Sequence, residues 1–258
     1  MIIPGIVSAT FKAETPAFVL RAMQNAGLTA VEWSENWHVP AGDTQAAAEL
    51  RERTLAQGAQ IAAYGSYYRL GQNQNPEADF LPSLQTAEAM QAPVIRIWGG
   101  NLPSAQLPAA QRTALAREAG LISRMAAQSG IRVALEWHKN TVTDTNESAL
   151  AFLEEAQTDN LYCLWQPTVA LDMEQRCDGI RMLEQRQRLL NLHVYYWREG
   201  KRRPFAEGLG EWQRYLAQLD PHKTRFGLLE FVLGDTLEQF LADAAQWKNL
   251  LHGSTTTV

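Results

Sequence analysis

The stretch Ala109–Ser129, followed by Gly130 and then by Ile131-Arg132-Val133-Ala134-Leu135-Glu136, shows the unit that decides the fold. Its first part is rich in Ala, Leu, Arg and Gln and stops at a glycine, as helices commonly do. Its second part is a short apolar run, typical of a parallel strand buried on both faces. The same alternation extends along the chain, and the predicted strands are Ile2–Ser8, Ala30–Trp33, Gln60–Tyr64, Pro93–Trp98, Ile131–Glu136, Leu161–Trp165, Leu189–Val194 and Arg225–Glu230.

The segments between these strands carry residues that begin and end helices. Thr15 before Pro16 predicts an N-cap and a first helical residue, and Gly27 predicts the end of that helix. Asp43 and Gly58 mark the next helix in the same way. Further N-caps are expected at Asn146, Asp172 and Asp235.

The number of units favours one fold class. Eight strand–helix units in 258 residues leave about 32 residues per unit, enough for a strand, a helix and two loops. We therefore expect an α/β protein with a single (β/α)8 TIM barrel over residues 1–252 and a loose C-terminal tail at 253–258. The alternative is an open doubly wound sheet, which usually has a glycine-rich phosphate loop after its first strand. Residues 9–12, Ala-Thr-Phe-Lys, contain no glycine.

Composition excludes several classes of protein. The chain is 46% hydrophobic and 20% charged, so it can bury a core, and its formal net charge of −5 disfavours nucleic-acid binding. No apolar run is long enough to span a membrane, and the start lacks the pattern of a secretion signal. Cys163 and Cys177 are too few for a disulfide scaffold, so we expect reduced thiols in a cytoplasmic protein. A homo-oligomer is left open.

Polar side chains end four consecutive predicted strands. Glu136, Gln166, His193 and Glu230 are separated by 30, 27 and 37 residues, close to one unit each. In such a barrel the active site lies at the carboxyl ends of the strands, where these four side chains would converge. Two carboxylates, an imidazole and an amide oxygen suit Mn²⁺, Mg²⁺, Co²⁺ or Zn²⁺. The alternative for each is a structural ion pair or a capped strand end.

Aromatic residues gather at the same predicted rim, which holds six of the eight tryptophans. Aromatic faces suit the C–H faces of sugars, so a small carbohydrate is the expected ligand. The basic run Arg198–Arg203 could bind a phosphate or carboxylate, although a solvated loop is the ordinary interpretation. We also expect a buried ion pair between Arg96 and Glu32 beneath the pocket. The predicted substrate-binding residues are His138, Trp33, His38, Tyr64, Trp98, Trp165 and Arg198.

These residues resemble the xylose-isomerase-like TIM barrels, in particular the sugar (phosphate) isomerase/epimerase group. The resemblance covers nearly the whole chain: Glu136, His193 and Glu230 match the metal ligands of the family, and Ala206–Trp212 resembles its glycine-rich turn. Two positions depart from the pattern. Gln166 replaces the usual acidic ligand, and residues 193–196 read His-Val-Tyr-Tyr instead of His-x-Lys-Asp.

The resemblance implies a metal-dependent ketose or aldose isomerase or epimerase, with Mn²⁺ as the expected ion. Glu136 and Glu230 would act as base and acid on the two sides of a carbon next to a carbonyl, through an enediolate. A lyase or dehydratase acting on a keto-sugar or inosose would use the same first step. A non-catalytic sugar-binding barrel is a further alternative, favoured by the neutral Gln166. The endonuclease branch is disfavoured by only five histidines and the acidic charge.

Overall fold

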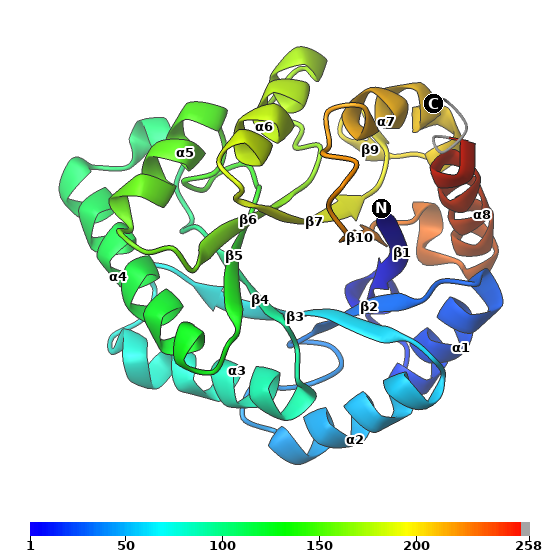
Figure 1. Ribbon diagram of the computed structural model, residues 1–258, viewed down its shortest axis with the longest axis horizontal. Coiled ribbons are helices and arrows are strands. Elements are labelled where there is room, and N and C mark those ends of the chain that lie inside the picture. Colours follow the sequence, from blue (N-terminus) through cyan, green and yellow to red (C-terminus); the bar gives the residue numbers. More distant parts are fainter. Residues whose placement is uncertain (254–258) are drawn as a thin grey trace.

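The computed structural model describes residues 1–253 and confirms the closed barrel of parallel strands. Each strand pairs with its neighbours in parallel register, and the first pairs with the last, so the sheet has no free edge (Figure 1). The order around the barrel is β1-β10-β7-β6-β5-β4-β3-β2. The strands are β1 (Ile2–Val7), β2 (Ala30–Ser34), β3 (Gln60–Arg69), β4 (Val94–Trp98), β5 (Arg132–Glu136), β6 (Leu161–Trp165), β7 (Leu189–Val194) and β10 (Arg225–Leu229).

Eight α-helices form a ring outside the strands, and this arrangement is the predicted α/β TIM barrel (Figure 1). The helices are α1 (Pro16–Ala26), α2 (Thr44–Ala56), α3 (Pro76–Met90), α4 (Ala109–Gln128), α5 (Asn146–Glu155), α6 (Met173–Gln185), α7 (Leu209–Leu216) and α8 (Leu237–Gly253). Gly253, which was expected in the tail, is therefore the last residue of α8. The rest of the predicted tail lies outside the described residues.

Three of the predicted N-caps are confirmed by side-chain hydrogen bonds. Thr15 accepts a hydrogen bond from the backbone N–H of Phe18, and Asp43 caps α2 in the same way. Asp172 and Gln175 form a reciprocal capping box at the start of α6. Each bond satisfies an N–H group that the first helical turn leaves without a partner.

Two other N-caps lie one residue away from the predicted position. Thr145, in extended conformation, caps α5, so Asn146 is the first helical residue. Thr236 accepts the capping bond at the start of α8. Asp235 ends a short 3-10 turn with a left-handed φ of 51°, which is incompatible with the extended backbone of an N-cap.

Small apolar residues fill the inside of the barrel below its carboxyl end. Ala63, Val94, Ala134 and Leu164 form a buried cluster separate from the larger core between strands and helices. Because side chains two residues apart on a strand point to the same face, the next inward position on three of these strands holds a polar side chain. Those polar residues are Arg96, Glu136 and Gln166.

The loop after β7 contains a short hairpin that the sequence did not predict. Its strands are β8 (Trp197–Arg198) and β9 (Lys201–Arg202), and Glu199 and Gly200 turn the chain with positive φ angles. Elsewhere, both cysteines are buried free thiols. Within the described residues, the helices are too short or too polar to cross a lipid bilayer.

Candidate active site

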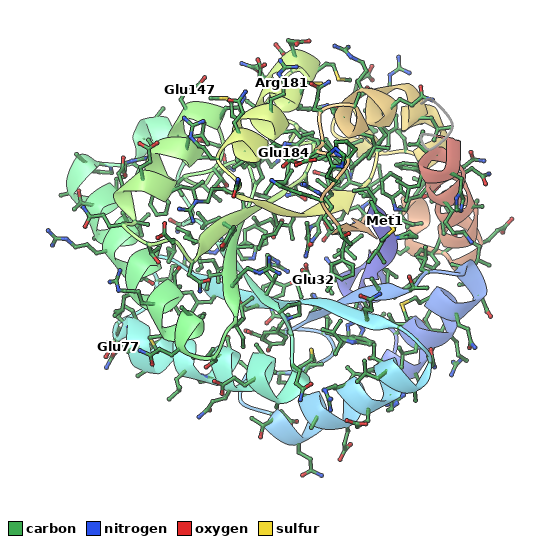
Figure 2. The ribbon with its side chains drawn as sticks, viewed as in Figure 1. Met1, Glu32, Glu77, Glu147, Arg181 and Glu184 are labelled. Carbon is green, nitrogen blue, oxygen red and sulfur yellow. The ribbon has the colours of Figure 1, made fainter. Side chains whose placement is uncertain are left out.

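Charged side chains form one buried layer inside the carboxyl end of the barrel. Glu32 on β2, Arg96 on β4, Glu136 on β5 and His193 on β7 are all at most 4% exposed. Glu230 directly follows β10 and is 8% exposed. Figure 2 shows Glu32 near the centre of the ring of strands. The fold therefore brings the predicted carboxylates and imidazole together, and it places the charged side chains of Glu32 and Arg96 in the same layer.

The predicted Arg96–Glu32 ion pair is confirmed, and Arg96 also binds a second acid. Its Nε lies 3.2 Å from Glu32 Oε1, and its Nη1 lies 3.2 Å from Glu136 Oε2. Nη1 also donates to the carbonyl oxygen of Ser66. Burial raises the pKa of Glu32, but His193 and Arg96 outweigh burial and hold it below its usual value. A buried guanidinium with two carboxylates offsets its own loss of hydration.

His193 lies between two carboxylates. Its Nε2 is 3.1 Å from Glu32 Oε2, and its Nδ1 is 3.2 Å from Glu230 Oε2. Burial alone would lower the pKa of His193, but Glu32 and Glu230 raise it to about 10. Neither Nδ1 nor Glu230 Oε2 has a hydrogen-bond partner of good geometry. Two facing lone pairs at this distance repel each other unless a cation, either a proton or a metal ion, lies beside them.

The amide of Gln166 has a fixed orientation. Its Nε2 donates to Glu136 Oε1 over 3.0 Å and to the carbonyl oxygen of Trp137 over 2.9 Å. Because both partners only accept hydrogen bonds, the NH₂ group must lie on their side. The opposite atom, Oε1, is buried and has no hydrogen-bond partner. Gln166 therefore presents a free oxygen, although the residue that usually occupies its position is an acid.

The donor atoms fit a divalent cation in their chemistry and in their charge. Gln166 Oε1, His193 Nδ1 and Glu230 Oε2 are buried and lack partners, and oxygen and imidazole nitrogen are ligands of divalent ions. With His193 protonated, as its raised pKa requires near neutral pH, three carboxylates face two cations and leave one excess negative charge; release of that proton to a metal ion would leave two. Among residues 1–253, no three His, Cys, Asp or Glu side chains form a ready cluster of ligands.

A small pocket of about 80 Å³ opens above this layer. Gln166 and His138 reach its wall from the charged layer and from the strand end. His138 packs 4.7 Å from the ring of Trp98 and donates from Nδ1 to the carbonyl oxygen of Lys139, which leaves Nε2 as its free nitrogen. The other lining residues are Lys139, Thr168, Val169, Tyr195, Trp197 and Phe231.

Three aromatic residues predicted to bind substrate lie instead in the layer between strands and helices. Trp33, Tyr64 and Trp165 are fully buried. Trp33 donates to Thr54 of α2, and Trp165 packs against α7. Their neighbours in sequence, such as Glu32 and Gln166, point into the barrel, so strand alternation turns these aromatic rings outward. The expectation that they contact substrate is corrected accordingly.

Two further predicted residues lie away from the pocket lining. His38 is buried in the loop after β2, where its ring contacts Ser8 Oγ and the carbonyl oxygen of Glu14, and burial lowers its pKa. Arg198 is exposed on the β8–β9 hairpin. His38 thus stabilises the loop after β2. A role of Arg198 in substrate binding stays a prediction.

Sequence analysis missed the roles of Glu32, Arg96 and Tyr195 in the site itself. Tyr195 lies two residues after His193 and lines the pocket. Burial raises its pKa well above the usual value, and the nearby Glu230 and Glu136 raise it further, so its hydroxyl stays neutral. Spacing by two residues from His193 was the signal that could have identified it.

The chain belongs to the xylose isomerase-like TIM barrel family, whose model matches residues 20–229. The resemblance stated from the motifs is thereby confirmed. Comparison with curated protein sequences gives no match.

Solved structures show the same fold at low sequence identity. The probable 3-DHS dehydratase AsbF from Bacillus anthracis is 17% identical with a TM-score of 0.74, covering 97% of this chain and 99% of that one. L-ribulose 3-epimerase is 14% identical with a TM-score of 0.75, covering 98% and 96%. IolI, solved with a zinc atom, is 12% identical with a TM-score of 0.73, covering 99% and 100%.

Proposed function

We propose that the protein is a divalent-metal-dependent isomerase or epimerase of ketoses or aldoses, acting by proton abstraction next to a carbonyl. One observation carries the proposal: three buried ligand atoms without hydrogen-bond partners belong to a cluster in which carboxylates outnumber cations. A buried cluster of this kind is stable only with a compensating cation. Mn²⁺ is the expected ion, with Mg²⁺, Co²⁺ and Zn²⁺ as alternatives.

Glu230, His193 and Gln166 would hold the ion, with Glu136 beside them. When bound, the ion supplies a Lewis acid that withdraws charge from a substrate carbonyl. Glu32 receives the hydrogen bond of His193 Nε2 and so leaves Nδ1 as the free nitrogen. The same carboxylate pairs with Arg96, so Glu32 positions both His193 and Arg96.

Glu136 and Glu230 are the proposed acid–base pair. Arg96 and Gln166 hold the two oxygens of Glu136 from one side, at 3.2 and 3.0 Å. Glu230 pairs with His193 and lies three strands away from Glu136 in the order β10-β7-β6-β5, so the two carboxylates can face a substrate from different directions. A proton taken by one and returned by the other inverts a carbon, whereas return to the neighbouring carbon exchanges aldose and ketose.

Metal binding is tested by calorimetry of the chelator-treated protein with Mn²⁺, Co²⁺ and Zn²⁺. We expect one ion per chain in the wild type and a strong loss of affinity in Glu230→Gln. The exposed Glu238 of α8 offers the matched control, because Glu238→Gln removes the same charge far from the site. Equal affinity in wild type and Glu230→Gln would reject the proposed metal site.

Proton abstraction is tested in deuterium oxide with ketopentoses and ketohexoses such as L-ribulose and D-fructose. Deuterium enters the carbon next to the carbonyl whenever that proton is exchanged, whichever product forms, so NMR detects the first step directly. We expect incorporation with the metal-loaded wild type and none with Glu136→Gln or Glu230→Gln. Incorporation that is undiminished in both variants would reject their roles.

A lyase or dehydratase is the second candidate, and His138 is the observation that favours it. Its free Nε2 belongs to a side chain that lines the pocket two residues beyond Glu136. A protonated imidazole there could donate its Nε2 proton to a leaving hydroxyl, which departs as water, after the first proton is removed. Mass spectrometry separates the candidates, because elimination releases water and isomerisation conserves the substrate mass.

A further inference from the structure

We propose that the substrate of this site carries a carboxylate and that Arg69 binds it at the mouth of the barrel. The inference rests on the proposed function, since it places the carboxylate relative to the reacting carbon of the same substrate. It assigns a role to a cation that the proposed chemistry leaves unused.

Arg69 is held rigidly at the end of β3. Its backbone pairs with Trp98 of β4, and its guanidinium stacks 4.5 Å from the centre of the Trp98 ring. One nitrogen, Nη1, donates to the carbonyl oxygen of Gly100 over 2.8 Å. Stacking on a large aromatic ring fixes the plane of a guanidinium and leaves its edge available for hydrogen bonds.

The loop that follows Arg69 is anchored from below. Glu118 of α4 is buried, and its carboxylate accepts hydrogen bonds from the hydroxyl of Tyr68, the amide of Asn73 and the backbone N–H of Gly71. The amide of Asn73 also donates to the carbonyl oxygen of Arg69. A buried acid is thus used to fix the backbone on both sides of Arg69, as expected of a pre-organised binding residue.

Arg69 has no acidic partner of its own. Among residues 1–253, no carboxylate lies within 4 Å of its guanidinium, although the side chain is half-buried. By contrast, Arg112 pairs with Glu155 at 2.8 Å on the helical surface. A half-buried guanidinium loses part of its hydration, and only a bound anion would compensate for that loss.

The position of Arg69 couples it to the charged layer. Burial lowers the pKa of Arg69, Glu136 raises it, and the like charge of Arg96 lowers it, so the charges of Glu136 and Arg96 both act on the guanidinium of Arg69. Trp98 contacts Arg69 and also His138, the residue that lines the pocket. An anionic group on Arg69 would therefore lie beside Trp98, the ring that separates Arg69 from the pocket residue His138.

The chemistry of this cation favours a carboxylate close to the reacting centre. The free edge of a planar guanidinium matches the two oxygens of a carboxylate. A phosphate at the far end of a sugar would instead suit the exposed cations of the β8–β9 hairpin, Arg198 and Lys201. The structure therefore points to a sugar acid or keto acid with several hydroxyl groups.

Three probes differ only in their anionic group. D-fructose is neutral, 2-keto-D-gluconate is the same carbon chain with a carboxylate at the first carbon, and D-fructose 6-phosphate carries its anion at the far end. Binding is measured by calorimetry with the Mn²⁺-loaded protein in wild type, Arg69→Gln and Arg69→Lys. Arg117→Gln is the matched control, because Arg117 is exposed on α4 away from the mouth.

We expect 2-keto-D-gluconate to bind the wild type about 10- to 100-fold more tightly than D-fructose, the range for hydrogen bonds to a charged group. Arg69→Gln should remove this preference, Arg69→Lys should keep part of it, and Arg117→Gln should keep it all. If Arg69→Gln does not fold, Arg69→Lys tests the inference instead, because loss of the planar guanidinium edge must still weaken the binding of 2-keto-D-gluconate.

Two results would overturn the inference. One is a carboxylate preference that survives in both Arg69 variants; the other is a preference for D-fructose 6-phosphate that falls in Arg198→Gln. Either result, with deuterium exchange intact, leaves the proposed function standing. Conversely, carboxylate binding that depends on Arg69 in a protein that exchanges no deuterium on any probe would reject the proposed function and keep the carboxylate site.

Discussion

The two ends of the barrel both bury charged side chains and both leave polar atoms without a hydrogen-bond partner, but these atoms are N–H donors at the amino end and lone-pair acceptors at the carboxyl end. At the amino end, Arg225 is buried beside Glu184 of α6, whose second oxygen lies 3.1 Å from Lys223. The amino group of Met1 donates a hydrogen bond to the backbone carbonyl oxygen of Lys223, so the first residue of the chain is bound at this end as well.

At the carboxyl end, three carboxylates face one guanidinium and one imidazole, and donor atoms are left without partners. At the amino end, one acid, Glu184, is shared by two cations, and the N–H groups of the buried Arg225 are left without hydrogen-bond partners. The carboxyl end has lone pairs in excess, which need a cation. Comparison of these ends shows that the chemistry of the unpaired atoms matters more than incomplete pairing alone. Unpaired N–H groups cannot bind a cation, whereas unpaired oxygens and an imidazole nitrogen can.

The largest expected effect is on catalysis, and it is confined to the carboxyl end. Glu136→Gln and Glu230→Gln should each lower the rate of deuterium exchange by about 10²–10⁴-fold, the range for loss of a general acid or base. Glu184→Gln, the same change at the amino end, should leave the rate per folded molecule unchanged. A comparable loss in Glu184→Gln would erase the functional difference between the two ends.

Stability should also distinguish the two buried arginines. Arg96→Met leaves Glu32 and Glu136 buried without their shared cation, so we expect a loss of about 3–5 kcal/mol in the free energy of unfolding. Arg225→Met should cost less, because Glu184 keeps Lys223 as its partner. Urea unfolding of both variants checks the order, and a larger loss in Arg225→Met would contradict it.

A smaller effect is expected where a residue acts through a neighbour. Glu32→Gln removes the carboxylate that orients His193 without removing any proposed ligand. Affinity for Mn²⁺ should fall about 10–100-fold, as for other partners of metal-bound histidines. Glu184→Gln serves again as the control, and unchanged affinity in Glu32→Gln would show that Glu32 only supports the fold.

The smallest effect is the pH dependence of the chelator-treated protein. The pKa of His193 rises from 6.5 in an ordinary setting to about 10, so its protonated form stabilises the fold fully below pH 6.5. This stabilisation should decline as pH rises and be lost above pH 10. His193→Asn should flatten that slope in urea unfolding between pH 7 and 10. A slope of the same size in the variant would assign the effect to other groups.

The sequence determined the eight strands and several helix boundaries through local chemistry. Thr15, Asp43 and Asp172 were identified as N-caps because a cap needs only a side-chain oxygen a few atoms from the helix. The Arg96–Glu32 pair could also be predicted, because an inward guanidinium must find an inward acid. Apolar strands that end in carboxylates gave Glu136 and Glu230, since such a position is costly without a function or a partner.

Only the tertiary structure decided which side of each strand met the substrate pocket and which charges were left unpaired. Trp33 and Trp165 share strand ends with Glu32 and Gln166, yet they face the helices. Alternate residues of a strand point to opposite sides of the sheet, and strand register determines which set points into the barrel. The binding of Arg96 to both Glu32 and Glu136, and the position of Arg69 on Trp98, join strands that are distant in sequence. Pairing of charges across a closed sheet depends on distances of a few ångströms, and the order of residues along a chain does not contain those distances.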